Sequence, residues 1–347
     1  MKNGEKSDPM PRLPKWGIVA TVDEPAPLII AFAAYHLGIG AGEVHLYFDR
    51  PNPEAEAALA GLDAVFITNC TAAYWAQSAQ HTRPDHVNMR QRVNANEAFA
   101  KSQMDWIIHA DADEYLRPDG AVETMLSDIP AHIIAVRQMV IERFFVAEGT
   151  HDHIYEGQFR AKAHEFYKWR EEVYGRFGKF MKKGLSGHDA GKTFLRVGTP
   201  NVRFGIHFAF DEHDEIVTHM LREPDALLHF DGMTALHYKF KMMRRLGLPY
   251  YFSNQNPDGP ARDSQARFMR NNAARPREIE RLFEGMMVLD ATQIGALKAH
   301  DCLVPVPFDP RPYIVKSGIQ LDLSPAAFDA ALLGWAAQVS ELSEAAP

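Results

Sequence analysis

The sequence predicts an α/β protein with a mostly parallel β-sheet flanked by helices and a less regular C-terminal half. Over the first third of the chain, short apolar runs typical of buried strands alternate with segments of helical character. Three of these predicted strands are followed within two residues by an aspartate. The chain has 347 residues, of which 46% are hydrophobic, so it is long enough to bury a full-sized core.

The elements of the first third follow one another in a regular order. Trp16–Thr21 is the first predicted strand, and the acidic residue and prolines after it indicate a helix over Pro27–Leu37 that ends at Gly38. The remaining predicted elements are a strand over Glu43–Phe48, a helix over Asn52–Leu62, a strand over Ala64–Thr68, a helix over Val87–Gln103 and a strand over Trp106–His109. Such alternation forms a parallel sheet with helices on both faces.

Acidic residues follow the ends of the predicted strands. Asp23, Asp49 and Asp111 each come after such an end. Because parallel α/β sheets bind ligands beyond the carboxyl ends of their strands, we expect these three carboxylates to face one crevice.

The second half of the chain has a less regular pattern. Phe144–Gly191 is dense in aromatic, charged and glycine residues, and we expect loops and short elements there that lie over the site. The predicted regular elements are strands over Ala131–Ile141, Thr193–Val197 and Val202–Phe208, a basic amphipathic helix over Thr234–Leu246, and helices over Pro276–Met287 and Ser324–Leu342.

Composition excludes several classes of protein. A formal net charge of −8 argues against a surface that follows nucleic-acid phosphates. Cys70 and Cys302 alone can form neither a disulfide framework nor a thiolate zinc site, which favours a reducing cytoplasm. No stretch has the length and apolar character of a signal peptide or a membrane span, so we expect a cytoplasmic protein with at most peripheral membrane contact. The 16 histidines are more than we expect.

The segment Ile107–Leu116, IIHADADEYL, carries the sharpest motif. An apolar strand that leads into Asp-x-Asp places Asp111 and Asp113 on one side of an extended chain. Mg²⁺ and Mn²⁺ prefer oxygen ligands and commonly take one or two carboxylates together with substrate phosphates. The alternative is a solvated turn in which Asp113 caps a following helix.

Residues 16–117 resemble the nucleotide-sugar-binding half of a family 2-like glycosyltransferase with the GT-A fold. The resemblance rests on several short matches that occur in the same order as in that family, and the matches after residue 117 are weaker. The set comprises Thr21–Pro25, the Tyr35-His36-Leu37-Gly38 helix, Asp49, Arg90-Gln91 with Asn94, and Trp106 before Asp111-Ala112-Asp113-Glu114; the softer matches are Gly191–Arg196, His207 and Leu236–Lys239.

The resemblance implies a division of the chain and roles for its residues. A tail (1–15) would precede a nucleotide-sugar-binding half (16–142), an acceptor and metal-site region of the same domain (143–260) and a C-terminal helical cover (261–347). Thr21, Glu24 and Asp49 would line the base and ribose pocket, and Asp49 is suited to accept a base N–H. Asp111 would approach ribose or metal-bound water, and Asp113 would ligate the Mn²⁺ or Mg²⁺ that bridges the donor's phosphates.

Polar residues elsewhere could reach the same site. Gln91 and Asn94 are three residues apart, so they share a helical face that is either in the site or simply exposed. Lys192 could contact donor phosphates or an anionic acceptor. It lies in Gly187–Thr193, which resembles a phosphate-binding loop but has one residue too few between its glycines and precedes a β-like run.

Histidine is the expected third metal ligand. His207 is the first choice, because its predicted strand has apolar residues on the opposite face. His237 is the second choice and His229 the third, and each could instead be a histidine bonded to a backbone carbonyl or exposed. The His151/His153 pair has zinc-like spacing but is expected at the surface.

The catalytic base is less well marked. An inverting transferase needs a carboxylate that takes the proton of the acceptor hydroxyl. Asp189, Asp211 and Glu142 are possible, and we select Asp211, although the Asp211-Glu212 step is reversed relative to the family's usual Glu-Asp step.

These inferences combine into one functional hypothesis. The sequence predicts a metal-dependent, inverting glycosyltransferase that moves a sugar from a nucleoside diphosphate sugar, a UDP-sugar, to a carbohydrate, lipid-linked or other hydroxyl acceptor. One alternative is a non-catalytic sugar-nucleotide or glycan-binding protein on the same fold. Another is a metal-dependent nucleotidyltransferase, which the acidic, glycine-free segment 21–27 disfavours. The basic helix over Leu236–Arg245 suggests weak membrane contact as a minor hypothesis.

Overall fold

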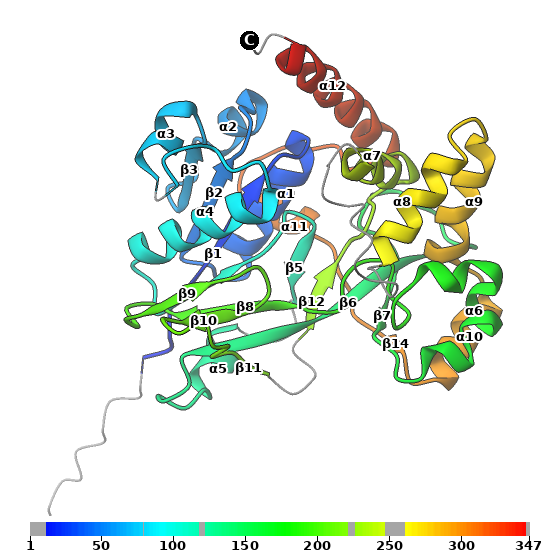
Figure 1. The fold of residues 1–347 in the computed structure, drawn as a ribbon, viewed down its shortest axis with the longest axis horizontal. Helices are drawn as coiled ribbons and strands as arrows, with labels where there is room; N and C mark the ends of the chain where they lie inside the picture. The colour runs from blue at the N-terminus through cyan, green and yellow to red at the C-terminus, as the bar shows by residue number, and fades with distance from the viewer. Residues whose placement is uncertain (1–11, 79, 118–121, 221–225, 247–260, 345–347) are drawn as a thin grey trace, which may run out of the picture.

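The computed structural model describes residues 12–78, 80–117, 122–220, 226–246 and 261–344 (Figure 1). Its strands, in chain order, are β1 (Trp16–Val22), β2 (Glu43–Phe48), β3 (Val65–Asn69), β4 (Trp106–His109), β5 (Glu114–Leu116), β6 (Ala135–Val146), β7 (Gln158–Ala161), β8 (Lys192–Arg196), β9 (Val202–Phe204), β10 (Ala209–Asp211), β11 (His219–Met220), β12 (Ala226–His229), β13 (Val288–Leu289) and β14 (Leu303–Val304).

Helices separate most of these strands. They are α1 (Ala26–Gly38), α2 (Pro53–Leu59), α3 (Ala72–Gln77), α4 (Val87–Lys101), α5 (Val122–Ser127), α6 (Arg170–Tyr174), α7 (Ala235–Leu246), α8 (Ala261–Asn271), α9 (Pro276–Met287), α10 (Ala291–Ala299), α11 (Arg311–Lys316) and α12 (Pro325–Glu344), with 3₁₀ turns η1 (Phe166–Lys168) and η2 (Gly175–Phe180). Among the described residues, no helix is long and apolar enough to cross a membrane.

The predicted α/β fold with a mixed, mostly parallel sheet is confirmed. Over the described residues, 12 strands form one sheet with the central order β14-β7-β6-β8-β4-β1-β2-β3, and β9 and β10 form a separate hairpin. The strands β3, β2, β1 and β4 are parallel, as the alternation in the first third predicts. From β4 onward, β8, β6 and β7 are antiparallel neighbours.

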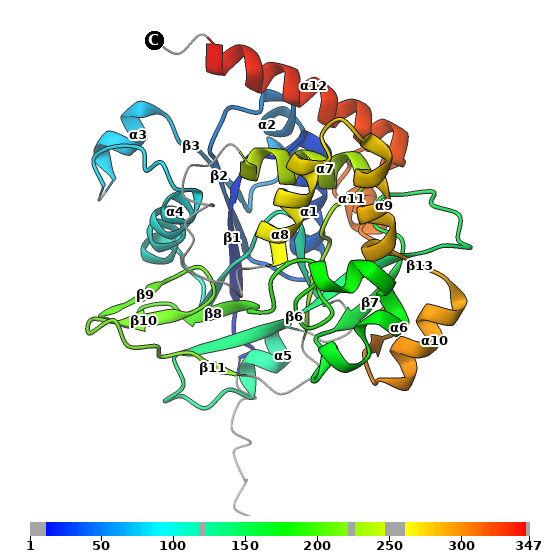
Figure 2. The same cartoon turned by 45° about the vertical axis from the view of Figure 1, so that its right-hand side comes forward.

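Helices cover both faces of the parallel half. Along β1, Ile18 and Ala20 pack in the core that contains α1, whereas Val19 packs on the other side with Ala95 and Ala98 of α4. Figure 2 shows α1 and α4 on opposite sides of β1. This alternation is what a strand buried on both faces produces, since successive side chains point to opposite faces.

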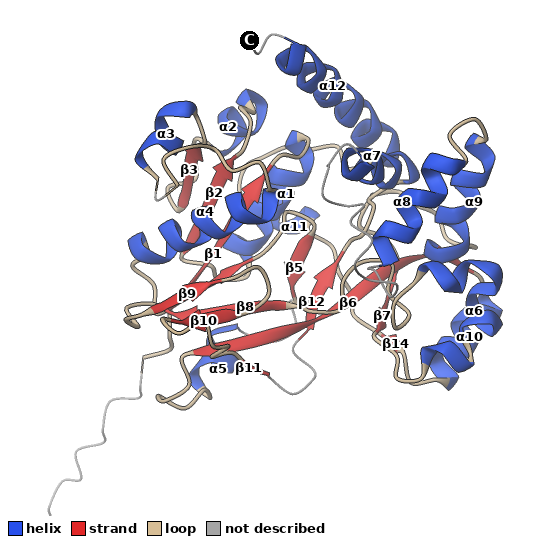
Figure 3. Ribbon diagram, in the orientation of Figure 1, coloured by secondary structure: helices blue, strands red, loops and turns tan. Residues whose placement is uncertain are grey.

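Strand β6 connects the parallel half to the rest of the molecule. It pairs with β8 and β11 at its start, with β12 and β7 in its middle and with β13 at its end. Figure 3 shows this long strand crossing the molecule. The strand was expected over Ala131–Ile141 but occupies Ala135–Val146, so the proposed division between residues 142 and 143 falls inside it.

The aromatic-rich segment 144–191 builds a second core in addition to loops. Phe144, Phe166 and Tyr174 pack with Leu282 and Met286 of α9 in a cluster separate from the sheet's main cores. Aromatic side chains bury large apolar areas, which explains why a segment with little regular structure is nevertheless well packed.

One local expectation is wrong, and the helix-capping alternative for Asp113 is excluded. The predicted strand Val202–Phe208 is interrupted, because Gly205 donates a hydrogen bond from its N–H to the carbonyl of Phe208 (2.7 Å) and the chain turns back into β10. His207 therefore lies in a turn, not on a strand. Asp113 caps no helix, because strand β5 follows it directly.

Gly191, directly before β8, provides a test of the packing between β8 and β6. Its φ is +71°, and a Cβ there would lie 2.0 Å from the carbonyl oxygen of Gln138. Gly198 has a similar φ of +80°, but a Cβ there would meet nothing within 4 Å. We expect Gly191→Ala to lower the free energy of unfolding by roughly 2–5 kcal/mol and Gly198→Ala by only about 1–2 kcal/mol in urea titrations. Equal losses in the two variants would show that the close approach to β6 is unimportant.

Candidate functional site

Three adjacent strands bring ionisable side chains to one level of the sheet. His229 of β12 is opposite Glu114 of β5 in the antiparallel register and opposite Glu142 of β6 in the parallel register. The turn from β4 to β5 carries Asp111 and Asp113, and Phe230 donates its N–H to the carbonyl of Asp113 (2.9 Å). The backbone pairing thus gathers acids that lie far apart in the sequence.

Five carboxylates form what we call the acidic cluster. Its members are Asp111, Asp113, Glu114, Glu142 and Asp231, all buried except Asp111, which is partly exposed. Buried carboxylates are stable only when they are paired with cations or hydrogen-bond donors. Each member of the acidic cluster has such partners.

Lys192 lies between Asp111 and Glu114. Its Nζ is 2.8 Å from Oδ2 of Asp111 and 3.3 Å from Oε2 of Glu114, and the side chain is fully buried. Burial alone would lower the pKa of Lys192, but the two carboxylates raise it above its ordinary value, so the ammonium is retained. Burial would raise the pKa of Glu114, but Lys192 and the histidines His188 and His229 together outweigh that effect and hold it low.

Two further contacts support Asp111. Gln91 on α4 donates its side-chain N–H to Oδ1 of Asp111. The backbone N–H of Asp111 donates to Oε2 of Glu114 (2.8 Å). Gln91 therefore reaches the site, as its helical face allows.

Asp113 and Asp231 share a second set of cations. Lys241 on α7 is ion-paired with Asp113 and lies 3.5 Å from Asp231, which is also ion-paired with Arg262. Nε2 of His229 is 3.7 Å from Oδ2 of Asp113. Burial opposes ionisation of Asp113, but Lys241 and His229 together hold its pKa well below the ordinary value.

Glu142 is held by Arg160 and by backbone donors. Arg160 is 2.6 Å away, and the N–H groups of Ser186 and Gly187 donate at 2.8 and 2.7 Å. Burial would raise the pKa of Glu142, yet Arg160 lowers it to about 2. His229, 3.6 Å from Glu142, experiences the opposite balance: burial lowers its pKa, but Asp113 and Glu142 raise it to about 10.

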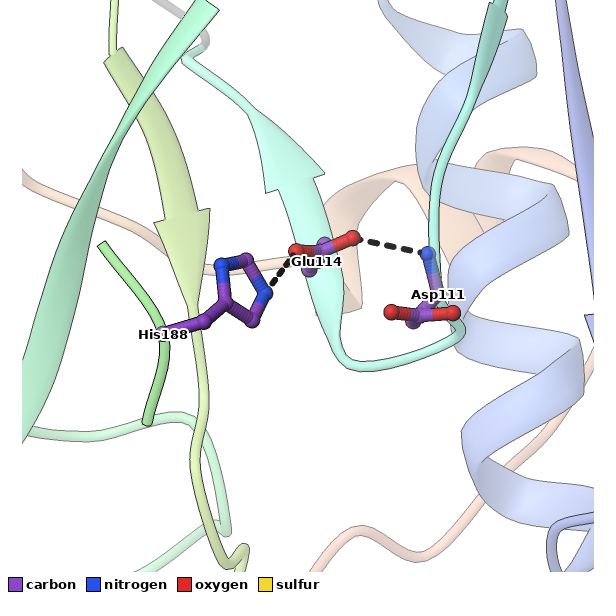
Figure 4. A group of neighbouring side chains, drawn as sticks. All are labelled: Asp111, Glu114 and His188. Atoms are coloured by element: carbon purple, nitrogen blue, oxygen red, sulfur yellow. Dashed lines mark hydrogen bonds and ion pairs between the residues drawn. The ribbon is translucent and has the colours of Figure 1, made fainter. Parts of the chain in front are cut away.

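His188 is a functional candidate that the sequence analysis missed. Its Nε2 is 3.0 Å from Oε1 of Glu114, and its ring lies beside the rings of His207 and His229, with centroids 4.6 and 5.2 Å away. Figure 4 shows His188 and Asp111 on the two sides of Glu114. Donor atoms of these three residues lie within 4.8 Å of one another, the only such set of His, Cys, Asp or Glu among the described residues.

The four predicted metal ligands are not brought into one set. Asp111 contacts Lys192 and Asp113 contacts Lys241, so their carboxylates have different partners. Nδ1 of His207 is 2.8 Å from the carbonyl of Gly191, and burial, followed by Lys192, lowers its pKa to about 3.

His237 is held in a different place. Its Nδ1 accepts the N–H of Met233 (3.1 Å), and its Nε2 is 3.6 Å from Oε2 of Glu24. Neither this histidine nor His207 belongs to the three-residue set around Glu114 within the described parts of the chain. His237 therefore connects α7 to the predicted nucleotide pocket at the end of β1.

The predicted nucleotide pocket is built from the ends of β1 and β2. Asn94 donates a hydrogen bond to the hydroxyl of Thr21 (2.9 Å) and accepts one from the hydroxyl of Tyr74 (2.7 Å). The predicted site residues Thr21 and Asn94 are thus hydrogen-bonded to each other. Oδ2 of Asp49 is 2.8 Å from Arg83 and 2.9 Å from Arg90. Its Oδ1 is buried and has no hydrogen-bond partner among the described residues.

Asp23, at the end of β1, is bound by two arginines. Arg50 donates to Oδ1 (2.8 Å), and Arg244 on α7 donates to the backbone carbonyl (3.0 Å) and also pairs with the carboxylate. Burial would raise the pKa of Asp23, and Arg244 and Arg50 lower it. The two aspartates that end β1 and β2 are thus each matched with two guanidinium groups.

Asp211, the predicted base, lies at the end of β10. Its Oδ1 accepts the backbone N–H groups of His213 (2.8 Å) and Glu215 (2.9 Å). These bonds close its own loop and do not connect it to the acidic cluster. Of the other possible bases, Glu142 belongs to the acidic cluster, and Asp189 pairs with Lys183 (2.6 Å).

Comparisons with known proteins give little similarity. No family model matches the chain, and no curated protein matches it. The crystal structure of S. aureus TarS 1-349 matches with 9% identity over 76% of this chain and 73% of that chain, at a TM-score of 0.33. The same protein in complex with UDP-GlcNAc matches with 10% identity over 76% and 74%, at a TM-score of 0.31. Similarity this low leaves function to be argued from the site itself.

The raised pKa of His229 makes stability depend on pH. A histidine whose folded pKa is about 10, above the ordinary 6.5, stabilises the fold fully below pH 6.5 and loses that contribution as pH rises through 10. We therefore expect His229→Gln to lower the free energy of unfolding by roughly 3–5 kcal/mol at pH 6 and by much less near pH 10.

Urea titrations at several pH values measure this difference. His213→Gln is the matched control, because His213 is largely exposed and should give no such trend. A deficit in His229→Gln that is constant from pH 6 to pH 10 would mean that His229 is not charged in the folded protein.

Proposed function

We propose that the protein transfers a sugar from a nucleoside diphosphate sugar, a UDP-sugar, to a hydroxyl acceptor. The observation that carries the proposal is the gathering of charged residues at the carboxyl ends of β1, β2 and β4. Asp23, Asp49 and Asp111 follow these strands, and each is matched with basic side chains. Parallel α/β sheets bind their ligands at this place.

The end of β2 is suited to a uracil base. Oδ1 of Asp49 is an acceptor without a partner among the described residues, while Oδ2 is fixed by Arg83 and Arg90. A buried acceptor of this kind favours a ligand that brings an N–H donor. Uracil carries such a donor at N3, and the corresponding position of cytosine has none.

The reaction itself needs charge stabilisation and a proton acceptor. The acceptor oxygen forms a bond to the anomeric carbon as the bond from that carbon to the diphosphate oxygen breaks, and the nucleoside diphosphate leaves with the electron pair. Positive side chains near the leaving oxygens stabilise the developing charge. The hydroxyl proton passes to a carboxylate. Asp211 remains the predicted base, and an inverting outcome and a carbohydrate or lipid-linked acceptor remain predictions.

A donor panel separates transfer from binding alone. Nucleotide sugars with different bases and sugars are incubated with carbohydrate and lipid-linked acceptors, and released nucleoside diphosphate is measured. We expect release with a UDP-sugar only when an acceptor is present. UDP binding without release from any pair of donor and acceptor would favour the non-catalytic binding protein. Release of pyrophosphate from a nucleoside triphosphate and a sugar phosphate would favour a nucleotidyltransferase.

Asp49 gives a second, more local prediction. We expect Asp49→Asn to weaken UDP binding at least about tenfold and to reduce the preference for UDP over CDP, because asparagine has only one, uncharged, acceptor oxygen for Arg83, Arg90 and the base together. Titration calorimetry with both nucleotides measures this. Asp128→Asn is the control, since Asp128 is exposed just after the end of α5. Unchanged selectivity in Asp49→Asn would exclude Asp49 as the base-reading residue.

A further inference from the structure

The acidic cluster raises the question of which cation neutralises it. Asp111, Glu114 and His188 have the donor chemistry of a Mn²⁺ or Mg²⁺ site, with two carboxylates and an imidazole. The ammonium of Lys192, however, lies 2.8 Å from Asp111 and 3.3 Å from Glu114. A lysine ammonium has no lone pair to offer a metal, and it would repel a divalent ion held by the same carboxylates. With Lys192 in place, these residues do not fit a metal ion.

The other acid of the Asp-x-Asp motif is in the same situation. Asp113 is ion-paired with Lys241, and His229 lies 3.7 Å away. Lys241 also lies 3.5 Å from Asp231. Each of the two motif acids therefore has a lysine ammonium as a direct ion-pair partner.

The cations and carboxylates of this region balance. Among the described residues, the five carboxylates of the acidic cluster form ion pairs with four lysine and arginine side chains and two histidines. These are Lys192, Lys241, Arg160, Arg262, His229 and His188. The four lysine and arginine side chains and the charged His229 match the five carboxylates in number. A cluster that is neutral on its own offers a divalent cation no excess of negative charge to compensate.

We propose that the basic face of α7, with Lys192 behind it, replaces a divalent metal as the source of positive charge for the donor's diphosphate. The part of this proposal that concerns the donor rests on the proposed function. Lys241 and Arg244 lie three residues apart on α7, so they share a face. That face contacts Asp113 and Asp23, at the ends of β4 and β1.

The two lysines have different roles in this arrangement. Lys192 is fully buried and positions Asp111 and Glu114 by neutralising them. The Lys241 side chain is 23% exposed and has three N–H donors, so it can bind a phosphate oxygen while it remains close to Asp113. Lys241 is thus the phosphate-binding residue, and the basic character of α7 is explained by the acids that it covers.

The first experiment needs no nucleotide. Mn²⁺ is titrated into the protein, and free Mn²⁺ is followed by electron paramagnetic resonance. We expect the wild type to leave the Mn²⁺ signal unchanged. Lys192→Met, which leaves Asp111 and Glu114 without their ammonium, should bind Mn²⁺, and the Lys192→Met/Glu114→Gln double variant should bind it less. Tight binding of Mn²⁺ by the wild type would overturn the proposal.

The second experiment uses UDP and titration calorimetry. We expect the wild-type affinity to agree within about twofold in EDTA and in Mn²⁺, and Lys241→Met to lose about tenfold or more in both. Lys239→Met is the matched control, because Lys239 is exposed on the same helix. If Lys241→Met does not fold, the Lys241→Gln/Asp113→Asn double variant removes both partners of the pair and should show the same loss. A UDP affinity of the wild type that rises tenfold or more with Mn²⁺ would contradict the proposal. Equal losses of UDP affinity in Lys241→Met and Lys239→Met would also contradict it.

The two experiments distinguish an error in the proposed function from an error in the proposal for α7. If the wild type binds neither UDP nor a UDP-sugar in any buffer, the proposed function is wrong, and the Mn²⁺ titration still decides whether lysines neutralise the acidic cluster. If UDP binds only with Mn²⁺, the proposed function stands and the proposal for α7 is wrong.

Discussion

The ammonium of Lys192, buried between the carboxylates of Asp111 and Glu114, is the interaction on which the site depends. Without it, the turn after β4 would place the carboxylate of Asp111 beside that of Glu114, which is fully buried, and two neighbouring negative charges with one of them buried are strongly unfavourable. The lysine begins β8, the first antiparallel strand beside the parallel half, and Gly191 before it approaches the backbone of β6 closely. One ion pair thus joins the parallel half, the antiparallel half and the acid motif.

The charges around this pair give the site its chemical character. Acids at the ends of the strands do not leave an unbalanced negative crevice, because lysines and arginines from β8, β7, α7 and α8 neutralise them. Asp23 and Asp49 each bind two arginines, so the nucleotide side carries more positive than negative charge around these two residues. A ligand with two phosphates and a base that donates a hydrogen bond suits such an arrangement.

The sequence was sufficient for the parallel half and insufficient for most of the site. Strands β1 to β4 and helix α4 follow local signals, namely apolar runs, helical periodicity and strand-end acids, and these are confirmed. His188, Asp231 and Lys241 have no local signal, because pairing among β5, β6 and β12 and packing of α7 bring them together. His207 was misplaced for a related reason: alternation over Val202–Phe208 matches a strand, but the bond from Gly205 to Phe208 makes a turn. Only the neighbours of a charged residue show whether it binds a metal or a lysine.

The strands that pair with β6 all follow it in the sequence, which determines when β6 can pair during synthesis. Strand β6 pairs with β7, β8, β11, β12 and β13, and its pairing with β13, which includes Phe145 with Val288, spans more than 140 positions of sequence. Contacts of such long range form late, since the loop between them must close first. When β6 leaves the ribosome, none of these five partner strands has yet emerged from it. The backbone edge at the end of β6 therefore stays unpaired until β13 is made, and an unpaired strand edge of this kind is exposed to wrong pairing in the interval.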